Sequence, residues 1–370
     1  MAADDTNEPS ATANPEPLVV IIGAGFAGLA AAGSLANRNV QAVVVDQNNL
    51  HTFRPLLYQV GRTPNVSFRH ASVTGIDPQA KTVTLSQETT LGYDRLIVAS
   101  GSAVSYHHVP GAERWALPLY TLDDARRLRN RLVRLLERAD ENPAAHQGDG
   151  PSFVVVGSGP TEVETAGALV ELLEVSVERD RMRLGAAPPQ VILVDALDRP
   201  LTGFTDRSAR YATKTLAARG VTLRLGTPVA EITDKAVHLA DGETIPADVV
   251  VWAGGVTVDG TPAALLPGQK GPGGRVAVDA SLALPGHPEI FVAGDATAVC
   301  RSPADSRLAP QLAQVAIQTG RHAAEQAWRS VNGEPLEPFV YHDRGIMATI
   351  GRRAAVAEIA TPFGQQVTLR

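Results

Sequence analysis

Cysteine is almost absent from the 370-residue sequence, which holds a single one, Cys300. One thiol excludes an internal disulfide, a cysteine zinc cluster and a CxxC redox pair, and we expect no metal site. A disulfide reductase that works through a cysteine pair is excluded for the same reason. We expect Cys300 to be buried or incidental.

Long apolar runs are missing as well. Hydrophobic residues make up 44% and charged residues 19% of the chain, yet no run approaches the about 18 apolar residues that a membrane helix needs. An integral membrane protein is therefore not expected. Residues 1–17 have neither a basic start nor an apolar core, which argues against a secretory signal. We expect a disordered tail there and a cytoplasmic protein.

Basic residues are outnumbered by acidic ones: the chain has 33 Lys and Arg and 39 Asp and Glu, which gives a formal net charge of −6. Nucleic-acid binding needs clustered Lys and Arg, so we expect no nucleic-acid partner. The one locally basic segment, 126–140, is interpreted as a helix with a solvated face.

What the sequence does contain is an alternation of short β-branched runs with helical patterns, which is typical of parallel α/β structure. The length suits two or three domains. Two series of strands, each opened by a glycine turn, predict two doubly wound, Rossmann-like domains. The predicted strands span 18–23, 41–46, 95–100, 152–157, 190–195, 248–253 and 289–294.

The first glycine turn lies in "VVIIGAGFAGLAAAG" (19–33). Gly23 permits the tight turn, Gly25 lets a pyrophosphate approach the backbone, and Gly28 lets the helix pack closely on the strand. The free N–H groups of the helix then face the anion. Asp46 ends the next strand, where a carboxylate meets a ribose hydroxyl. The pattern predicts a nucleotide cradle.

The second turn, in "VVVGSGPTEVETAG" (154–167), carries Gly157 and Gly159 followed by Pro160 and Thr161. Proline suits the first helical turn, where a missing N–H costs nothing. Asp195 ends the following strand and would repel the 2′-phosphate of NADPH, which favours NADH; the alternative is a strand-end carboxylate that faces solvent. Two cradles in one chain predict an enzyme that holds a flavin and a nicotinamide dinucleotide face to face, because no side chain accepts a hydride.

Six segments in sequence order resemble the type II NADH:quinone oxidoreductases, single-subunit flavoproteins with two dinucleotide-binding domains. The resemblance runs from about residue 18 to 359, and its most specific parts are "PLLYQV", "AQVAIQ" and "MATIGR". The segments are "HTFRPLLYQV" (51–60), "YDRLIVASG" (93–101), "GSGPTEVETAG" (157–167), "FVAGDATAV" (291–299), "APQLAQVAIQTG" (309–320) and "GIMATIGRRAAVAEI" (345–359).

The resemblance implies FAD as cofactor and NADH as co-substrate. Asp295 is expected to hold the flavin ribityl chain, although it could instead cap a helix, and both could be true. The implied FAD residues are Gly23, Gly25, Phe26, Ala27, Gly28, Asp46, Ala99, Ser100, Gly101, Gly294, Asp295 and Ala313. The implied NADH residues are Gly157, Gly159, Pro160, Thr161, Asp195 and Gly254.

Three further residues carry the implied chemistry. Gln314 and Gln318 share one helix face, which in the family lies beside the flavin and lines the quinone pocket, with Ala313 small enough to admit the ring. The alternative is that the two glutamines are surface residues without a role in binding. Glu164 matches a family acid near the nicotinamide and quinone; as an alternative it completes a capping box with Thr161.

The resemblance predicts an FAD domain in two parts, 18–114 and 256–330, around an NADH domain at 115–255. A C-terminal segment, 331–370, would follow. The chain departs from the family in the short connection after "PLLYQV" and in its end at "PFGQQVTLR", where the family continues into membrane-resting helices. Membrane attachment at the cytoplasmic face is therefore left open, as is a homodimer.

A third departure is Glu162, which stands where the second turn of the family has a glycine. At the third helical position its charge suits the helix dipole by roughly 0.3–1 kcal/mol. A pyrophosphate about 6–8 Å away would be repelled by roughly 2–3 kcal/mol, so we expect weak NADH binding.

The sequence thus predicts FAD-dependent NADH oxidation with electron transfer to a quinone. Two alternatives stay open. One is an NADH-dependent reductase with a soluble acceptor, and the other is a degenerate FAD-binding protein without catalysis.

Overall fold

The computed structural model describes residues 16–48, 63–86, 88–141, 150–178, 188–360 and 366–369. The chain divides into two compact units: a first unit of residues 1–102 and 258–341, and a second unit of 103–257 and 342–370. The first division falls twelve residues before the predicted one, at 102/103 instead of 114/115, because the strand that follows Ser102 pairs with Val256–Thr257 of the second unit. The expected C-terminal segment is shared between the units.

The first unit is built on a sheet with the order β19-β20-β7-β1-β2-β3 among its described strands. All neighbours are parallel except β19, which runs antiparallel to β20. The strands are β1 (Leu18–Ile22), β2 (Gln41–Asp46), β3 (Val66–His70), β7 (Arg95–Val98), β19 (Ala283–Leu284) and β20 (His287–Val292).

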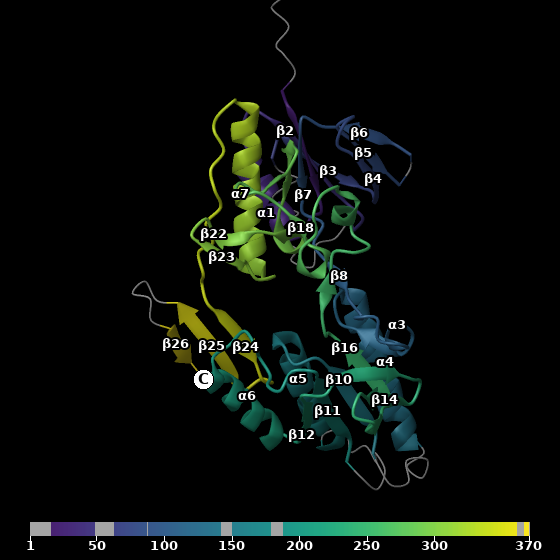
Figure 1. Cartoon of the computed structure of the whole chain (residues 1–370). Helices are drawn as coiled ribbons and strands as arrows, with labels where there is room; N and C mark the ends of the chain where they lie inside the picture. The colour runs from purple at the N-terminus through teal and green to yellow at the C-terminus, as the bar shows by residue number, and fades with distance from the viewer. Residues whose placement is uncertain are drawn as a thin grey trace, which may run out of the picture. The chain divides into compact units, whose positions relative to one another are not determined.

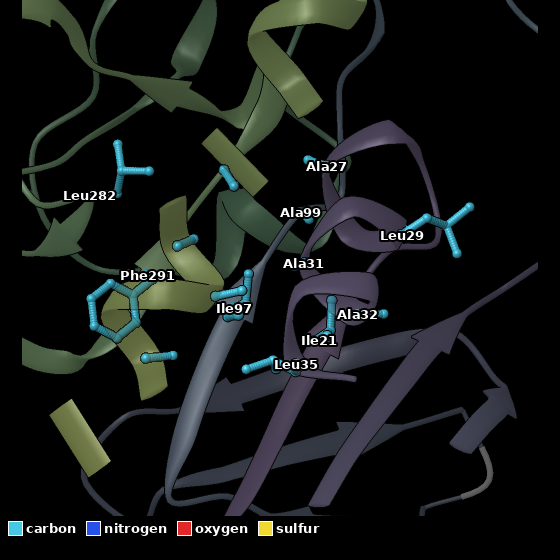
Figure 2. Packing of buried hydrophobic residues seen from close by; sticks show 14 of the residues in the cluster. Ile21, Ala27, Leu29, Ala31, Ala32, Leu35, Ile97, Ala99, Leu282 and Phe291 are labelled. Atoms are coloured by element: carbon cyan, nitrogen blue, oxygen red, sulfur yellow. The ribbon is translucent and has the colours of Figure 1, made fainter. Parts of the chain in front are cut away.

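Two helices pack together beside this sheet, α1 (Phe26–Leu35) and α7 (Ala313–Val331), and Figure 1 draws them side by side. Their approach is close, because a Cβ added at Gly320 would lie 2.7 Å from the carbonyl carbon of Ala27. Figure 2 shows the resulting core, in which alanines of α1 and aliphatic side chains of β1 and β7 share one cluster with Phe291.

Shorter elements complete the first unit. Three antiparallel strands that the sequence did not predict form a small sheet, β4 (Val73–Asp77), β5 (Thr82–Leu85) and β6 (Thr90–Gly92). The others are η2 (Pro262–Leu265), η3 (Pro272–Gly274), β18 (Val276–Ala277), η4 (Gly294–Ala296), β21 (Thr297–Ala298), β22 (Cys300–Ser302) and β23 (Asp305–Leu308).

The second unit repeats the plan with a parallel sheet in the order β12-β11-β10-β16-β9. Strand β10 is buried along its whole length, as its run of apolar residues predicts. The strands are β9 (Ala116–Pro118), β10 (Ser152–Val156), β11 (Gln190–Asp195), β12 (Val221–Leu225) and β16 (Val249–Trp252).

The helices of this unit are α3 (Ala112–Trp115), α4 (Leu122–Glu141), α5 (Pro160–Glu178) and α6 (Asp206–Ala218). Helix α4 covers the basic segment and buries Leu128, Leu132 and Leu136 at four-residue spacing, while its arginines face solvent. The interpretation of that segment as a helix with a solvated face is confirmed.

A strand pair and two small sheets remain in the second unit. The pair is β8 (Ala103–Val104) with β17 (Val256–Thr257). One sheet has the order β13 (Val229–Ile232), β14 (Ala236–Leu239), β15 (Thr244–Pro246), and the other has the order β24 (Ile346–Thr349), β25 (Ala355–Ala360), β26 (Gln366–Leu369). Across all the described residues, no helix combines the length and apolarity that crossing a membrane requires.

Candidate functional site: two dinucleotide turns

The first glycine turn has the geometry that its sequence predicts. Gly23 has φ +99° and donates its N–H to Val45 O at 2.8 Å. A Cβ at Gly23 would lie 2.8 Å from the carbonyl carbon of Ala99, and one at Gly28 would lie 2.9 Å from the carbonyl carbon of Gly23. Both glycines are therefore required by close backbone approach.

Gly25 differs from these two glycines. It is the N-cap of α1, and a Cβ there would meet no described atom within 4 Å. The following residues, Phe26 and Ala27, are half-buried and buried. The N-terminus of α1 thus faces open space beside Gly25, which fits the pyrophosphate of a dinucleotide such as FAD.

Asp46 lies at the end of β2 beside this turn. Its Oδ2 accepts the N–H of Ala24 at 2.6 Å, and its Oδ1 accepts that of Asn48 at 2.7 Å. These bonds fix the carboxylate, and a carboxylate has about four acceptor positions, so two remain for ribose hydroxyls.

Gly294 and Asp295 form the third part of the first site. Gly294 has φ +72° and donates its N–H to Thr319 Oγ1 of α7 at 2.9 Å. Ser102 Oγ donates to Asp295 Oδ2 at 3.3 Å. Burial raises the pKa of Asp295, while Ser102 and Arg275 oppose the shift. The capping alternative for Asp295 is wrong, because η4 has its N-cap at Ala293 and no side chain caps it.

The remaining residues expected at the flavin also lie in the first unit. Ser100 Oγ accepts the N–H of Ala263 at 3.2 Å, and Gly101 has φ +70°. On α7, Ala313 is exposed at the first turn, and Gln314 and Gln318 are half-buried one turn apart. The residues expected for FAD and for NADH thus separate completely, the first set into the first unit and the second into the second unit.

The second turn repeats the backbone of the first. Gly157 has φ +108° and donates to Val194 O at 2.8 Å, as Gly23 does to Val45. Because α5 begins at Pro160, Thr161 is already inside the helix and cannot be its N-cap, so the capping box with Glu164 is wrong. Glu164 Oε1 instead accepts the N–H of Thr349 at 3.0 Å.

The two turns differ at Glu162, whose side chain folds back over the second turn. A Cβ at Gly157 would lie 2.8 Å from Glu162 Oε1, and one at Gly159 would lie 2.9 Å from Oε2. The residue is 6% exposed. Burial raises its pKa to about 7; the N–H groups of Glu162 and Gly159 donate to the carboxyl and oppose this, and Asp195 adds to it.

Asp195 ends β11 and Gly254 follows β16, two strands of the same parallel sheet that lie on either side of β10. Asp195 is half-buried at the end of β11, and its Oδ1 accepts the N–H of Leu197 at 2.8 Å. Gly254 O lies 2.7 Å from His107 Nε2. The ring centroids of His107 and Trp252 lie 6.5 Å apart.

Sequence reasoning missed three residues around these sites. Gly320 lets α7 approach Ala27 of α1, and Thr319 accepts the N–H of Gly294. An isolated glycine inside a helical pattern was the available signal for Gly320. Nothing in the sequence pointed to His107, which has φ +48°. Cys300 was expected to be buried or incidental; the first of these is wrong, because its thiol is exposed. The segment 51–60 and residues 1–15 lie outside the described residues.

Two equivalent glycine turns, each at the end of a parallel strand in its own unit, define a protein with two dinucleotide-binding domains. The model of the pyridine nucleotide-disulphide oxidoreductase family matches residues 17–320. The chain is 34% identical to the type II NADH:quinone oxidoreductase NdhA of Mycobacterium tuberculosis, over 96% of this chain and 81% of that protein. It is 27% identical to the type II NADH:quinone oxidoreductase of Staphylococcus haemolyticus, over 95% and 90% of the two chains.

Among solved structures, NDH2 of Plasmodium falciparum in complex with NADH has the same fold, with a TM-score of 0.79, 15% identity, and coverage of 95% of this chain and 91% of that one. The chain belongs to the pyridine nucleotide-disulphide oxidoreductase family and, within it, to the type II NADH:quinone oxidoreductases.

Proposed function

We propose that the protein is an FAD-dependent NADH:quinone oxidoreductase that does not pump protons. Hydride would come from NADH, and two electrons would leave to a quinone; NADH and quinone are the two substrates that the names of its relatives state. The observation that carries the proposal is the pair of equivalent turns, the first of which is open at Gly25. FAD, when bound, supplies a hydride acceptor that no side chain can replace.

We assign FAD to the first unit. The N–H groups at the start of α1 would bind the pyrophosphate, and Asp46 would accept a ribose hydroxyl. Asp295 would accept a ribityl hydroxyl, since its carboxylate is held in place by Ser102. Ala99, Ser100 and Gly101 would supply backbone groups to the same cofactor. Nothing in this set needs a metal, because the chain's contribution is binding and orientation.

We assign NADH to the second unit, with the turn at Gly157 and Gly159 for the pyrophosphate and Asp195 for the adenosine ribose. Gly254, whose carbonyl faces His107, would leave room for the dinucleotide near the end of β16. Glu164 is fixed by the N–H of Thr349, so its part would be to hold β24 in place as much as to act on a proton.

The quinone site is assigned to the start of α7. Gln314 and Gln318 are half-buried one turn apart, and their amide groups would bond a quinone carbonyl beside the small, exposed Ala313. Long-tailed quinones reside in bilayers, so we infer that the enzyme works in peripheral contact with the cytoplasmic face of the cell membrane. We also infer a homodimer. Co-sedimentation with lipid vesicles and sedimentation velocity test these two inferences.

Steady-state turnover separates this function from its two alternatives. NADH oxidation that requires a short-tailed quinone supports the proposal. Turnover with a soluble one-electron acceptor and none with quinone would support a reductase with a soluble partner. If the protein contains flavin but oxidises NADH with neither kind of acceptor, it is a binding protein without catalysis.

A further inference from the structure

The second dinucleotide turn holds the carboxyl group of Glu162 at the place where the first turn is open. Both carboxylate oxygens of Glu162 point into the turn, one toward Gly157 and one toward Gly159. The same comparison at Gly25 finds no described atom within 4 Å. The two turns otherwise share their backbone hydrogen bonds, so the difference arises from this one side chain.

The groups that bind Glu162 are those that a pyrophosphate would use. The N–H groups of Gly159 and of Glu162 itself belong to the cap and first turn of α5, and both donate to the carboxyl. Such N–H groups form the anion site of a dinucleotide fold. A pyrophosphate and an ionised Glu162 therefore compete for the same donors and repel each other.

Among the described residues, no cation acts on the Glu162 carboxyl in place of these donors. Strand β11 contributes Asp195, which repels it. The segment after β11 reaches the turn through the backbone of Arg199 and Leu201, and the guanidinium of Arg199 is paired with Asp206. The turn itself contributes N–H groups, and burial further disfavours the charged form.

We propose that Glu162 is a proton-linked gate of the nicotinamide site: NADH binds with its pyrophosphate at the second turn only when the Glu162 carboxyl is neutral, so that binding takes up one proton. The proposal rests on the proposed use of NADH. Glu162 would then set the affinity of the second turn for its coenzyme. The first turn has no such side chain at Gly25.

The pH dependence follows from the carboxyl titrating near neutrality. With a pKa of about 7 in the free protein, the neutral fraction falls as pH rises. If only the neutral form accepts the ligand, the Kd at pH 8 is about 10-fold weaker than at pH 6. A bound pyrophosphate raises the pKa of the carboxyl further, so about one proton enters per ligand at pH 8.

The test is titration calorimetry of the FAD-loaded full chain with NAD⁺, which binds without reducing the flavin. Repetition in buffers of different ionisation enthalpy measures the protons taken up. We expect about one proton per NAD⁺ at pH 8 for the wild type. Glu162→Gln keeps the size of the side chain without the charge, and we expect it to take up none and to bind equally at pH 6 and pH 8.

Glu162→Gly opens the turn and is expected to bind NAD⁺ at least about 10-fold more tightly than the wild type at pH 8. Its thermal shift on adding NAD⁺ should grow accordingly, which reports binding without turnover. Glu174→Gln is the matched control, because Glu174 is exposed on the same helix, and it should behave as the wild type.

Two results would overturn the gate. One is wild-type binding that takes up no proton and keeps one affinity from pH 6 to pH 8; if NADH still bleaches the flavin, the proposed function survives this result. In the other, neither the wild type nor any of the three variants binds NAD⁺, and NADH does not bleach the flavin. That result would contradict both the gate and the proposed function.

Discussion

The contact between α1 and α7 supports the first dinucleotide turn, and one added methyl group tests it. In Gly320→Ala, the new Cβ would lie 2.7 Å from the carbonyl carbon and 2.8 Å from the Cα of Ala27. Carbon atoms pack at about 3.5 Å or more, so the helices must separate by about 0.8 Å. Overpacking of this kind against backbone costs about 3 kcal/mol, the upper part of its usual range.

The same substitution removes a helix-interior glycine, which contributes about 1 kcal/mol in the opposite direction. We therefore expect a net loss of about 2 kcal/mol, or a fall in Tm of about 4–8 °C for a unit of this size. The fraction of FAD retained on purification should also fall, because Gly294 and Ala27 lie in the same packed region.

Gly33→Ala is the matched control. Gly33 lies on the exposed side of α1, and a Cβ there would meet nothing within 4 Å. This variant should be more stable than the wild type by about 0.5–1 kcal/mol. Thermal unfolding followed by circular dichroism and by flavin fluorescence measures both effects. Equal stability of the two variants would refute the close packing of the helices as the reason for Gly320.

Asp195→Ser should narrow the preference for NADH over NADPH, measured as the ratio of the two kcat/KM values, whereas an unchanged ratio would assign the preference to another residue. Gln318→Leu should slow flavin reoxidation by quinone by about 10-fold, the effect of one lost hydrogen bond, and leave reduction by NADH unchanged in rapid mixing; equal damage to both steps would indicate misfolding instead. Glu358→Gln should lower the free energy of unfolding by about 2 kcal/mol at pH 7, because Glu358 is buried and accepts from Thr205 and Ser208. Burial raises the pKa of Glu358, but these hydrogen bonds outweigh it and hold the pKa below its usual value. The stabilisation is therefore complete above the unfolded pKa and is lost as pH falls through the lowered one; a difference between variant and wild type that persists unchanged in acid would contradict this.

The parallel strands were the most predictable part of the fold. Buried parallel strands are continuous apolar runs, and the predicted ranges 41–46 and 190–195 match β2 and β11 residue for residue. The antiparallel sheets β4–β6 and β13–β15 were missed, because their strands are three to five residues long and only partly buried.

The site was predictable where a backbone conformation selects the residue. Gly23 and Gly157 have positive φ, and no other residue type suits such turns as well. The sequence could not tell where the carboxyl of Glu162 points, because one residue at that position can face solvent or fold over the turn. Gly320 was missed for a similar reason, since its role depends on Ala27, which is far away in the sequence.

Our proposal for this chain is electron transfer from NADH through bound FAD to a quinone. Its most direct test is one anaerobic cuvette of the purified yellow protein, whose flavin should be released by heat as FAD. We expect NADH to bleach the flavin absorbance and a short-tailed quinone to restore it. A flavin that NADH leaves oxidised, or that stays bleached after quinone is added, would contradict the claim.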